Sequence, residues 1–413
     1  MLFLGIDWGS KVHAVCVADG TGKVLLRTEV AHRGTDVLSF VKELEQLSRG
    51  EPVIAAMEAP HGVMVEVLLE RGIECYSINP KQLDRFRDRH SCSGAKDDPL
   101  DAYVLARSLC TDLNLFRKIS IPTAEALALS ALNRSYEGLT EQVLALSNQI
   151  CDQLVRYFPQ LVELGDWHQE PWLWKLFEAA PTPARAPKLS RQKLEKILKD
   201  HRIRRHEAAS VLQSLREKPL PVAAGVADAA ATRIRLLLPV LRVAHQQRRE
   251  CSQQMKELLA RLTKEPESPE ETHHDAALLL SLPGIGVHNG AVMLVEASQA
   301  LQQRDYQALR RLAGVAPVSK RTGGRHKRPL VTRRHACNHR LREATYHWGR
   351  VASQTDPRTR EHYAQLRASG HSHGRAIRGV LDRLLKVLCA MLRAGAKYAP
   401  NEHPAQKNLP LPA

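Results

Sequence analysis

Short apolar segments alternate with amphipathic ones in the first part of the chain. Leu2–Asp7, Val12–Ala18 and Val24–Val30 are apolar runs separated by short polar turns, one of them the glycine-rich segment DGTGK. Such runs predict three strands of an antiparallel meander. Thr35–Leu47 follows with apolar side chains at helical spacing, which predicts an amphipathic helix.

The same alternation continues beyond this helix. Val53–Glu58 predicts a short buried strand that ends at an acid, and Ile73–Ile78 predicts another strand. Helices are expected near Val63–Arg71, from Pro80 onward and over Asp98–Leu109. The order βββαβαβα predicts a mixed sheet covered by helices. It is also the element order of the RNase H-like fold.

Two long helices are predicted in the middle of the chain. Apolar side chains recur at spacings of three and four residues in 134–158, as in a coiled-coil seam, and 234–262 repeats this pattern. These helices are expected to pair either with each other or with another subunit. The seam residues are Leu139, Val143, Leu146, Ile150 and Leu154, then Cys251, Met255, Leu258 and Leu262.

These patterns divide the chain into domains, because 413 residues exceed one ordinary core. We expect a domain at 1–125, a helical coiled-coil region at 126–272, a mainly helical domain at 273–398 and a loose tail at 399–413. The fold class is α/β plus α, with an N-terminal mixed sheet of the RNase H-like (RuvC-like) type.

Composition narrows the function classes. The net charge of +16 and the pI near 9.6 favour a polyanionic partner, and aromatic residues at 5% argue against a stacking platform for single strands. The eight cysteines are scattered without a CxxC pair, which argues against a disulfide framework and a structural zinc site. Neither a membrane span nor a secretion signal is predicted, so a cytoplasmic protein is expected.

Four carboxylates occupy notable positions. Asp7 and Glu58 end two apolar strands, where a sheet presents residues to ligands. Asp98 and Asp101 are three residues apart on one predicted helix and share a face, with Asp98 as the expected N-cap before Pro99. Each acid alone is more simply explained as a turn residue, a cap or a solvated helix position.

A cluster of such acids requires cations. Two unit charges about 4 Å apart repel by roughly 4 kcal/mol at an effective dielectric of about 20. Hard oxygen ligands select Mg²⁺ or Mn²⁺. Two such ions about 4 Å apart can hold the attacking and leaving oxygens of a phosphodiester. The four carboxylates therefore predict a site for phosphodiester chemistry.

Three sequence blocks carry these acids: GIDWGSKVHAVCV, MEAPHG and AKDDPLDAYVLA. They resemble the blocks of the DEDD-type insertion-sequence transposases, a family that includes Piv-like DNA invertases and recombinases guided by a bridge RNA. The family's aspartate, its glutamate and its K-x-D-x-x-D-A block, which begins here at Lys96, are all present. The resemblance covers most of the chain and is weakest in the middle.

The C-terminal half contains two candidate nucleic-acid contacts. The segment LPGIG resembles the turn of a helix-hairpin-helix, in which Gly284 and Gly286 would let backbone N–H groups approach a phosphate. An ordinary connection between helices is the alternative. Residues 310–342 contain eleven Arg and Lys and no Asp or Glu, and APVSKRTGGRHKRP within them predicts a basic loop along a nucleic-acid backbone. The expected contacts are Lys320, Arg321, Arg325, Lys327, Arg328, Arg333 and Arg334.

Other readings of this half remain open. The basic run is also compatible with a nonspecific basic surface or a site for an acidic protein. His335, Cys337 and His339 are too closely spaced for the usual zinc-finger pattern, so packing or phosphate contact is expected of them.

The resemblance also implies a hydroxyl nucleophile. The family carries a serine before a glycine, five positions after the proline of a G-x-x-P block. Here the block ends at Pro317 and the fifth position is Thr322, followed by Gly323, which departs from the family pattern. A threonine offers the same hydroxyl, but its methyl group crowds an in-line approach. Ser319 is the alternative nucleophile, and a weakened or inactive copy is the third reading.

The resemblance implies metal-dependent strand cleavage and exchange through a covalent protein–DNA intermediate. Implied partners are donor and target duplex DNA, a structured guide RNA and a homo-oligomer, either a dimer or a tetramer, in the bacterial cytoplasm at the nucleoid. Two alternatives remain. An RNase H-like nuclease or Holliday-junction resolvase would use water and need no hydroxyl, and a catalytically inactive nucleic-acid binder would tolerate loss of the acids.

Overall fold

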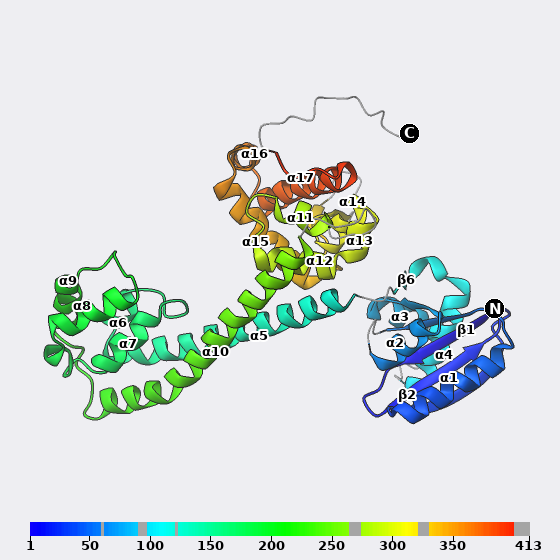
Figure 1. The fold of residues 1–413 in the computed structure, drawn as a ribbon, viewed down its shortest axis with the longest axis horizontal. Coiled ribbons are helices and arrows are strands. Elements are labelled where there is room, and N and C mark those ends of the chain that lie inside the picture. Colours follow the sequence, from blue (N-terminus) through cyan, green and yellow to red (C-terminus); the bar gives the residue numbers. More distant parts are fainter. Residues whose placement is uncertain (59–61, 90–96, 120–122, 264–273, 321–329, 400–413) are drawn as a thin grey trace. The chain divides into compact units, whose positions relative to one another are not determined.

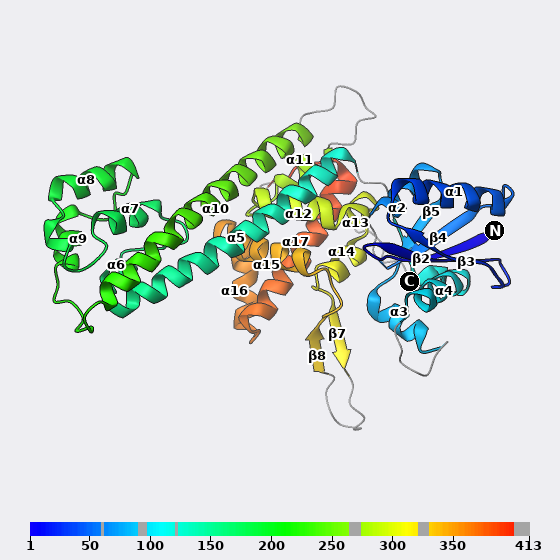
Figure 2. The same ribbon diagram turned by 90° about the horizontal axis from the view of Figure 1, so that it is seen from below.

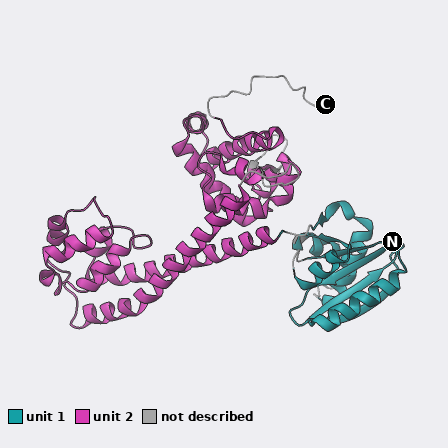
Figure 3. Cartoon of the chain, viewed as in Figure 1, with its two compact units in different colours: residues 1–123 teal, residues 124–413 magenta. Residues whose placement is uncertain are grey.

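The structure is a computed structural model of the chain. It describes residues 1–58, 62–89, 97–119, 123–263, 274–320 and 330–399. The chain forms two compact units, 1–123 and 124–413 (Figure 3). The first unit therefore ends just before the boundary expected at residue 125. The second unit joins the two helical regions that the sequence separates at residue 272.

Unit 1 contains a six-stranded mixed sheet of order β3-β2-β1-β4-β5-β6 (Figure 1). β1 is antiparallel to β2 and parallel to β4, and β4 is parallel to β5. Its elements are β1 (Leu2–Asp7), β2 (Val12–Ala18), β3 (Val24–Ala31), α1 (Gly34–Ser48), β4 (Val53–Met57), α2 (Val63–Glu70), β5 (Glu74–Ser77), α3 (Pro80–Arg87), α4 (Asp98–Thr111), the 3₁₀ turn η1 (Leu113–Leu115) and β6 (Arg117–Lys118). The mixed sheet expected from the sequence is confirmed, and only the two-residue edge strand β6 was not predicted.

Helices cover both faces of this sheet because its central strands are apolar on both sides. One core joins Leu4 and Ile6 of β1 to residues of α1 and α2, such as Phe40. The other core joins Phe3 of β1 to residues of α3 and α4, such as Leu105. The side chains of β1 thus alternate between the two cores, as the two-residue period of a strand requires.

Unit 2 is helical except for one pair of antiparallel strands among its described residues. Its elements are α5 (Ala124–Tyr157), α6 (Gln160–Glu163), α7 (Pro171–Ala179), the 3₁₀ turn η2 (Ala186–Lys188), α8 (Arg191–Asp200), α9 (Ala208–Leu215), α10 (Val226–Leu262), α11 (His274–Leu280), α12 (Val287–Glu296), α13 (Ser298–Gln302), α14 (Tyr306–Leu312), β7 (Pro317–Lys320), β8 (Leu330–Arg333), α15 (His339–Thr355), α16 (Pro357–Ala368) and α17 (His373–Ala394). No described helix of the chain is both long and apolar enough to span a membrane.

The long helices α5 and α10 pack against each other within the chain, side by side in both ribbon views (Figures 1 and 2). Leu129, near the start of α5, clusters with Met255 near the end of α10. Leu154, near the end of α5, shares a core with Ile234 near the start of α10. The helices are therefore antiparallel, and of the two pairings open from the sequence the structure contains the intramolecular one.

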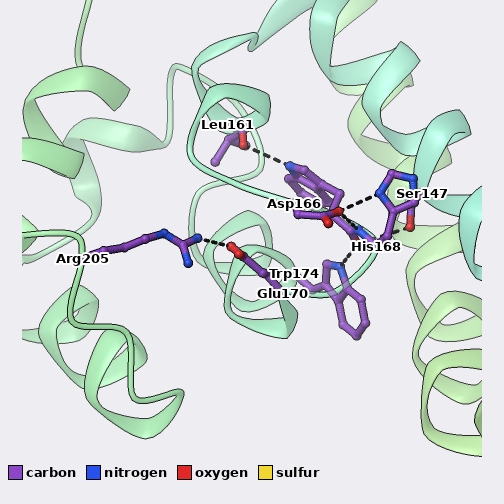
Figure 4. Close-up of polar contacts among 8 residues, drawn as sticks. Ser147, Leu161, Asp166, His168, Glu170, Trp174 and Arg205 are labelled. Atoms are coloured by element: carbon purple, nitrogen blue, oxygen red, sulfur yellow. Dashed lines mark hydrogen bonds and ion pairs between the residues drawn. The ribbon is translucent and has the colours of Figure 1, made fainter. Parts of the chain in front are cut away.

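The chain between α5 and α10 folds into a small aromatic-rich cap. Trp167 is buried, and its indole nitrogen donates to the carbonyl of Leu161 at 3.0 Å (Figure 4). The Trp167 carbonyl in turn accepts from Trp174 at 3.1 Å and from the Ser147 hydroxyl at 3.2 Å. An ion pair joins Arg205 to Glu170. These contacts fix α7 and the loop before it against α5.

The C-terminal part of unit 2 packs around α15 and α17. Trp348 of α15 is fully buried, and its indole nitrogen donates to the carbonyl of Pro283 at 2.9 Å. This part of the chain is mostly helical, as expected from the sequence. Residues 317–320, at the start of the segment expected to be a basic loop, instead form β7. This strand pairs antiparallel with β8, which directly follows that segment, with Ser319 opposite Val331 (Figure 2).

Candidate active site

Asp7 and Glu58 come from neighbouring parallel strands. Asp7 is the last residue of β1, and Glu58 directly follows β4. The last registered pair between these strands is Ile6 with Met57, so the two acids follow at the same edge of the sheet. Both residues are partly exposed. The strand-end positions agree with the sequence analysis, while the pairing of the two strands is a finding of the structure.

Helix α4 carries the other two acids and packs on β1 unusually closely. A Cβ atom added to Gly5 would lie 2.0 Å from the carbonyl oxygen of Ala102 and 2.5 Å from the backbone nitrogen of Ala106. Only a glycine allows this approach, two residues before Asp7. Asp98 is exposed at the start of α4, while Asp101 is fully buried one turn later.

The cap of α4 differs from the sequence prediction. The N-cap residue is Asp97, and Asp98 is the first helical residue. The prediction that Asp98 is the cap is therefore wrong by one position. The physical reason is that Pro99 fits either of the first two helical positions, so it does not by itself fix where the helix begins.

Asp101 is held by an arginine that the sequence analysis did not single out. The Arg87 side chain, from the end of α3, donates from Nε at 2.5 Å and from Nη2 at 2.7 Å to the two carboxylate oxygens of Asp101. Its Nη1 also donates to Asp84 at 2.8 Å. These hydrogen bonds raise the pKa of Arg87 above its usual value. The available sequence signal was the arginine pair Arg85 and Arg87 at the end of a predicted helix, with Asp101 fourteen residues after Arg87.

Breaking this ion pair is expected to destabilise unit 1. Arg87→Ala would leave the Asp101 carboxylate buried without its partner, which typically costs about 3–5 kcal/mol. Denaturant unfolding of the full chain measures this loss. Arg85→Ala removes an exposed arginine of the same helix and should change stability by less than about 0.5 kcal/mol. Equal effects of the two substitutions would contradict the buried pair.

The four carboxylates have the donor atoms that a divalent cation prefers, but they do not lie close enough together to bind one. All four donors are oxygen atoms, which Mg²⁺ prefers. Within the part of the chain that the structure describes, no group of three or more His, Cys, Asp or Glu side chains is close enough to hold a metal. Asp101 uses both oxygens on Arg87. In this arrangement the four carboxylates therefore do not form a metal site, and Asp101 is already bound to an arginine.

Aromatic rings lie beside Asp7 on the side of β2. Trp8 is 45% exposed, and its ring centroid is 6.1 Å from that of His13 and 6.3 Å from that of His32. His13 is buried, with Nε2 2.9 Å from Nδ1 of His32. Burial, followed by the nearby His32, lowers the pKa of His13. The sequence analysis missed this aromatic cluster, which begins directly after Asp7 in the chain.

The C-terminal candidate residues are only partly described. Thr322, Arg321, Arg325, Lys327 and Arg328 lie outside the described residues. The backbones of Ser319 and Lys320 lie in β7 and that of Arg333 in β8. Arg334 is half-buried, and its Nε donates to the carbonyl of Ala336 at 2.8 Å. These positions stay predictions as nucleophiles or nucleic-acid contacts.

The two glycines of the LPGIG turn have different environments. Gly284 has a φ of +73°, and an added Cβ would lie 2.7 Å from the backbone nitrogen of Ala352 in α15. Close packing therefore explains this glycine. Gly286 is exposed with a φ of +62°, and nothing lies within 4 Å of its added Cβ. The sulfur of Cys337, one of the zinc candidates, would lie 3.0 Å from a Cβ atom added to Gly314.

The mixed sheet with acids at two strand ends and on the helix beside them is consistent with an RNase H-like DEDD domain. Residues 4–159 match the DEDD transposase model of the IS110 type, and residues 276–364 match the model of the transposase IS116/IS110/IS902 family. The chain therefore carries both parts of a DEDD-type transposase.

Individual relatives agree with these matches. A mini-circle putative transposase for IS117 from Streptomyces coelicolor is 31% identical, over 93% of this chain and 92% of its own length. A putative transposase of Sinorhizobium fredii, y4uE, is 39% identical over 50% of this chain and 58% of its own length. An uncharacterized 43.6 kDa protein of insertion element IS110, also from Streptomyces coelicolor, is 25% identical over 96% of this chain. The chain belongs to the IS110-type family of DEDD transposases.

Proposed function

We propose that the protein cuts and exchanges DNA strands through a metal-dependent carboxylate site and a hydroxyl nucleophile. The observation that carries this proposal is the position of Asp7 and Glu58 at adjacent parallel strand ends, with α4 packed against β1 through Gly5. This packing keeps the acids of α4 next to the same strand. Family membership supports DNA as the substrate.

Asp7, Glu58 and Asp98 would hold the divalent cation, and Asp101 would join them once Arg87 releases its carboxylate. The cation, when bound, would lower the pKa of an attacking hydroxyl and stabilise charge on the phosphate. In the structure, the positive charge of Arg87 is paired with the buried carboxylate of Asp101. Because one guanidinium occupies both oxygens, Arg87 would control when the fourth carboxylate becomes available.

The hydroxyl of Thr322 would attack the DNA phosphorus. A new phosphorus–oxygen bond joins protein to DNA, the bond to one DNA oxygen breaks, and that oxygen leaves as a DNA hydroxyl. Attack by a DNA hydroxyl on the adduct reverses these changes and joins new strands. This exchange conserves the number of phosphodiester bonds, which agrees with the absence of a G-x-x-x-x-G-K-[ST] sequence from the chain.

We further propose that donor and target duplexes are brought together by a homo-oligomer and that a structured RNA selects the target. The basic composition supports both nucleic acids as partners. Base pairing would read the sequence, while the protein binds the backbone. A hydrolytic nuclease and an inactive binder remain the competing functions.

Covalent capture distinguishes these three functions. The purified protein is incubated with DNA carrying the element junctions and with its RNA, in Mg²⁺ or in EDTA, and analysed on a denaturing gel. A protein–DNA adduct that requires Mg²⁺ is expected. Mg²⁺-dependent cleavage without an adduct would instead identify a hydrolytic nuclease. Neither cleavage nor an adduct would identify an inactive binder.

A further inference from the structure

A basic groove runs along unit 2, between α7, the residue that follows α8 and the second half of α10. Its volume is about 730 Å³. Arg242, Arg249 and Lys256 of α10 line it, and Lys175 of α7 faces them. Among the described residues that line the groove, Glu250 is the single acid. Four cations against Glu250 in the groove and Glu178 beside it leave a net positive charge, which favours an anion.

The cations of α10 form one continuous stripe. Arg242, Arg249 and Lys256 are each seven residues apart, which places them on the same face of the helix. At 1.5 Å per residue the stripe spans about 21 Å. At 3.4 Å per base pair, this length corresponds to about six base pairs of a duplex. The spacing therefore suits an extended polyanion better than a single small anion.

Arg242 has hydrogen-bonding capacity that the protein does not use. Its Nη1 pairs with Glu178 at 2.6 Å, and Glu178 also accepts from Lys175 at 3.3 Å. Its Nη2 is buried and has no hydrogen-bond partner among the described residues. A buried donor without a partner is costly, so most are satisfied in folded proteins. Because Arg242 lines the groove, a phosphate oxygen bound there could supply the missing acceptor.

Buried aromatic side chains also line the groove. Trp174 is buried, donates to the Trp167 carbonyl (Figure 4) and meets His245 edge to face at 5.1 Å. Burial, together with Arg248 and Arg249, lowers the pKa of His245, which favours its neutral form. The cations therefore lie beside buried aromatic rings, and these rings are not exposed for stacking with nucleobases.

We propose that this groove binds the phosphodiester backbone of a nucleic acid, as a contact separate from the carboxylate site. The choice of a nucleic acid over another polyanion rests on the proposed function of the chain. Because the groove offers charge and no exposed stacking surface, binding there would be independent of base sequence. Both duplex DNA and structured RNA have the required backbone.

Charge reversal tests the groove. Arg249→Glu with Lys256→Glu changes two exposed groove residues, and Arg233→Glu with Arg261→Glu makes the same charge change at exposed positions of α10 outside it. Binding of the full chain to a labelled DNA duplex and to an RNA hairpin is measured by fluorescence anisotropy over a salt series. EDTA is present, so no chemistry takes place. Circular dichroism verifies that each variant is folded.

The groove variant should bind at least one of the two probes about tenfold more weakly. If that probe is the DNA duplex, its log–log salt slope should become shallower by about two. A loss on RNA alone assigns the groove to RNA, and a loss on DNA alone assigns it to DNA. Equal weakening by both variants, or no change in either, would overturn the proposal. These results are independent of adduct formation, so they leave the catalytic proposal to its own test.

Discussion

Thr322→Ala is expected to abolish the protein–DNA adduct, reducing its rate of formation by about a thousandfold or more. The substitution removes the proposed nucleophilic oxygen and keeps the backbone. Thr322→Ser keeps the oxygen and removes the methyl group that crowds an in-line approach, so it should form the adduct at least as fast as wild type. Time courses on denaturing gels measure both rates.

Two further variants complete this test. Ser319→Ala should form the adduct at the wild-type rate, and Asp7→Ala should not form it, because the carboxylate site is lost. A normal rate for Thr322→Ala with a loss in Ser319→Ala would transfer the nucleophile to Ser319. An adduct that persists in both hydroxyl variants would exclude both residues.

Gly5→Ala is expected to disrupt unit 1 and the candidate site together. The added methyl group would meet the backbone of α4, with the Ala102 carbonyl oxygen 2.0 Å from its carbon. Backbone cannot rotate away as a side chain can, so α4 must move and carry Asp98 and Asp101 with it. Overpacking of this kind costs about 3 kcal/mol. We expect a melting temperature roughly 10 °C lower and a loss of adduct formation.

Gly20→Ala is the matched control for this substitution. Gly20 lies in the turn after β2, where nothing is within 4 Å of an added Cβ. Thermal unfolding of the two variants should therefore differ clearly, with Gly20→Ala close to wild type. Wild-type stability in Gly5→Ala would mean that α4 does not approach β1 as closely in solution.

The elements of unit 1 were predictable because their signals are local. Leu2–Asp7 and Val12–Ala18 have the predicted bounds, since apolar runs and turn residues depend on neighbours in sequence. The acids at the ends of β1 and β4 followed from the same runs. The edge strand β6 was not predicted, because two residues are too few to show a period.

The sequence by itself determined the order of the strands and helices of unit 1 as far as α4, the two long amphipathic helices and the strand-end positions of Asp7 and Glu58. Only the tertiary structure decided that α5 packs against α10, that Arg87 forms an ion pair with Asp101 and that Lys175 lines the same groove as the cations of α10. The physical reason is that periodicity reports which face of an element is buried but not what buries it. Each of these contacts joins residues from different elements, and the packing of whole helices selects the partner.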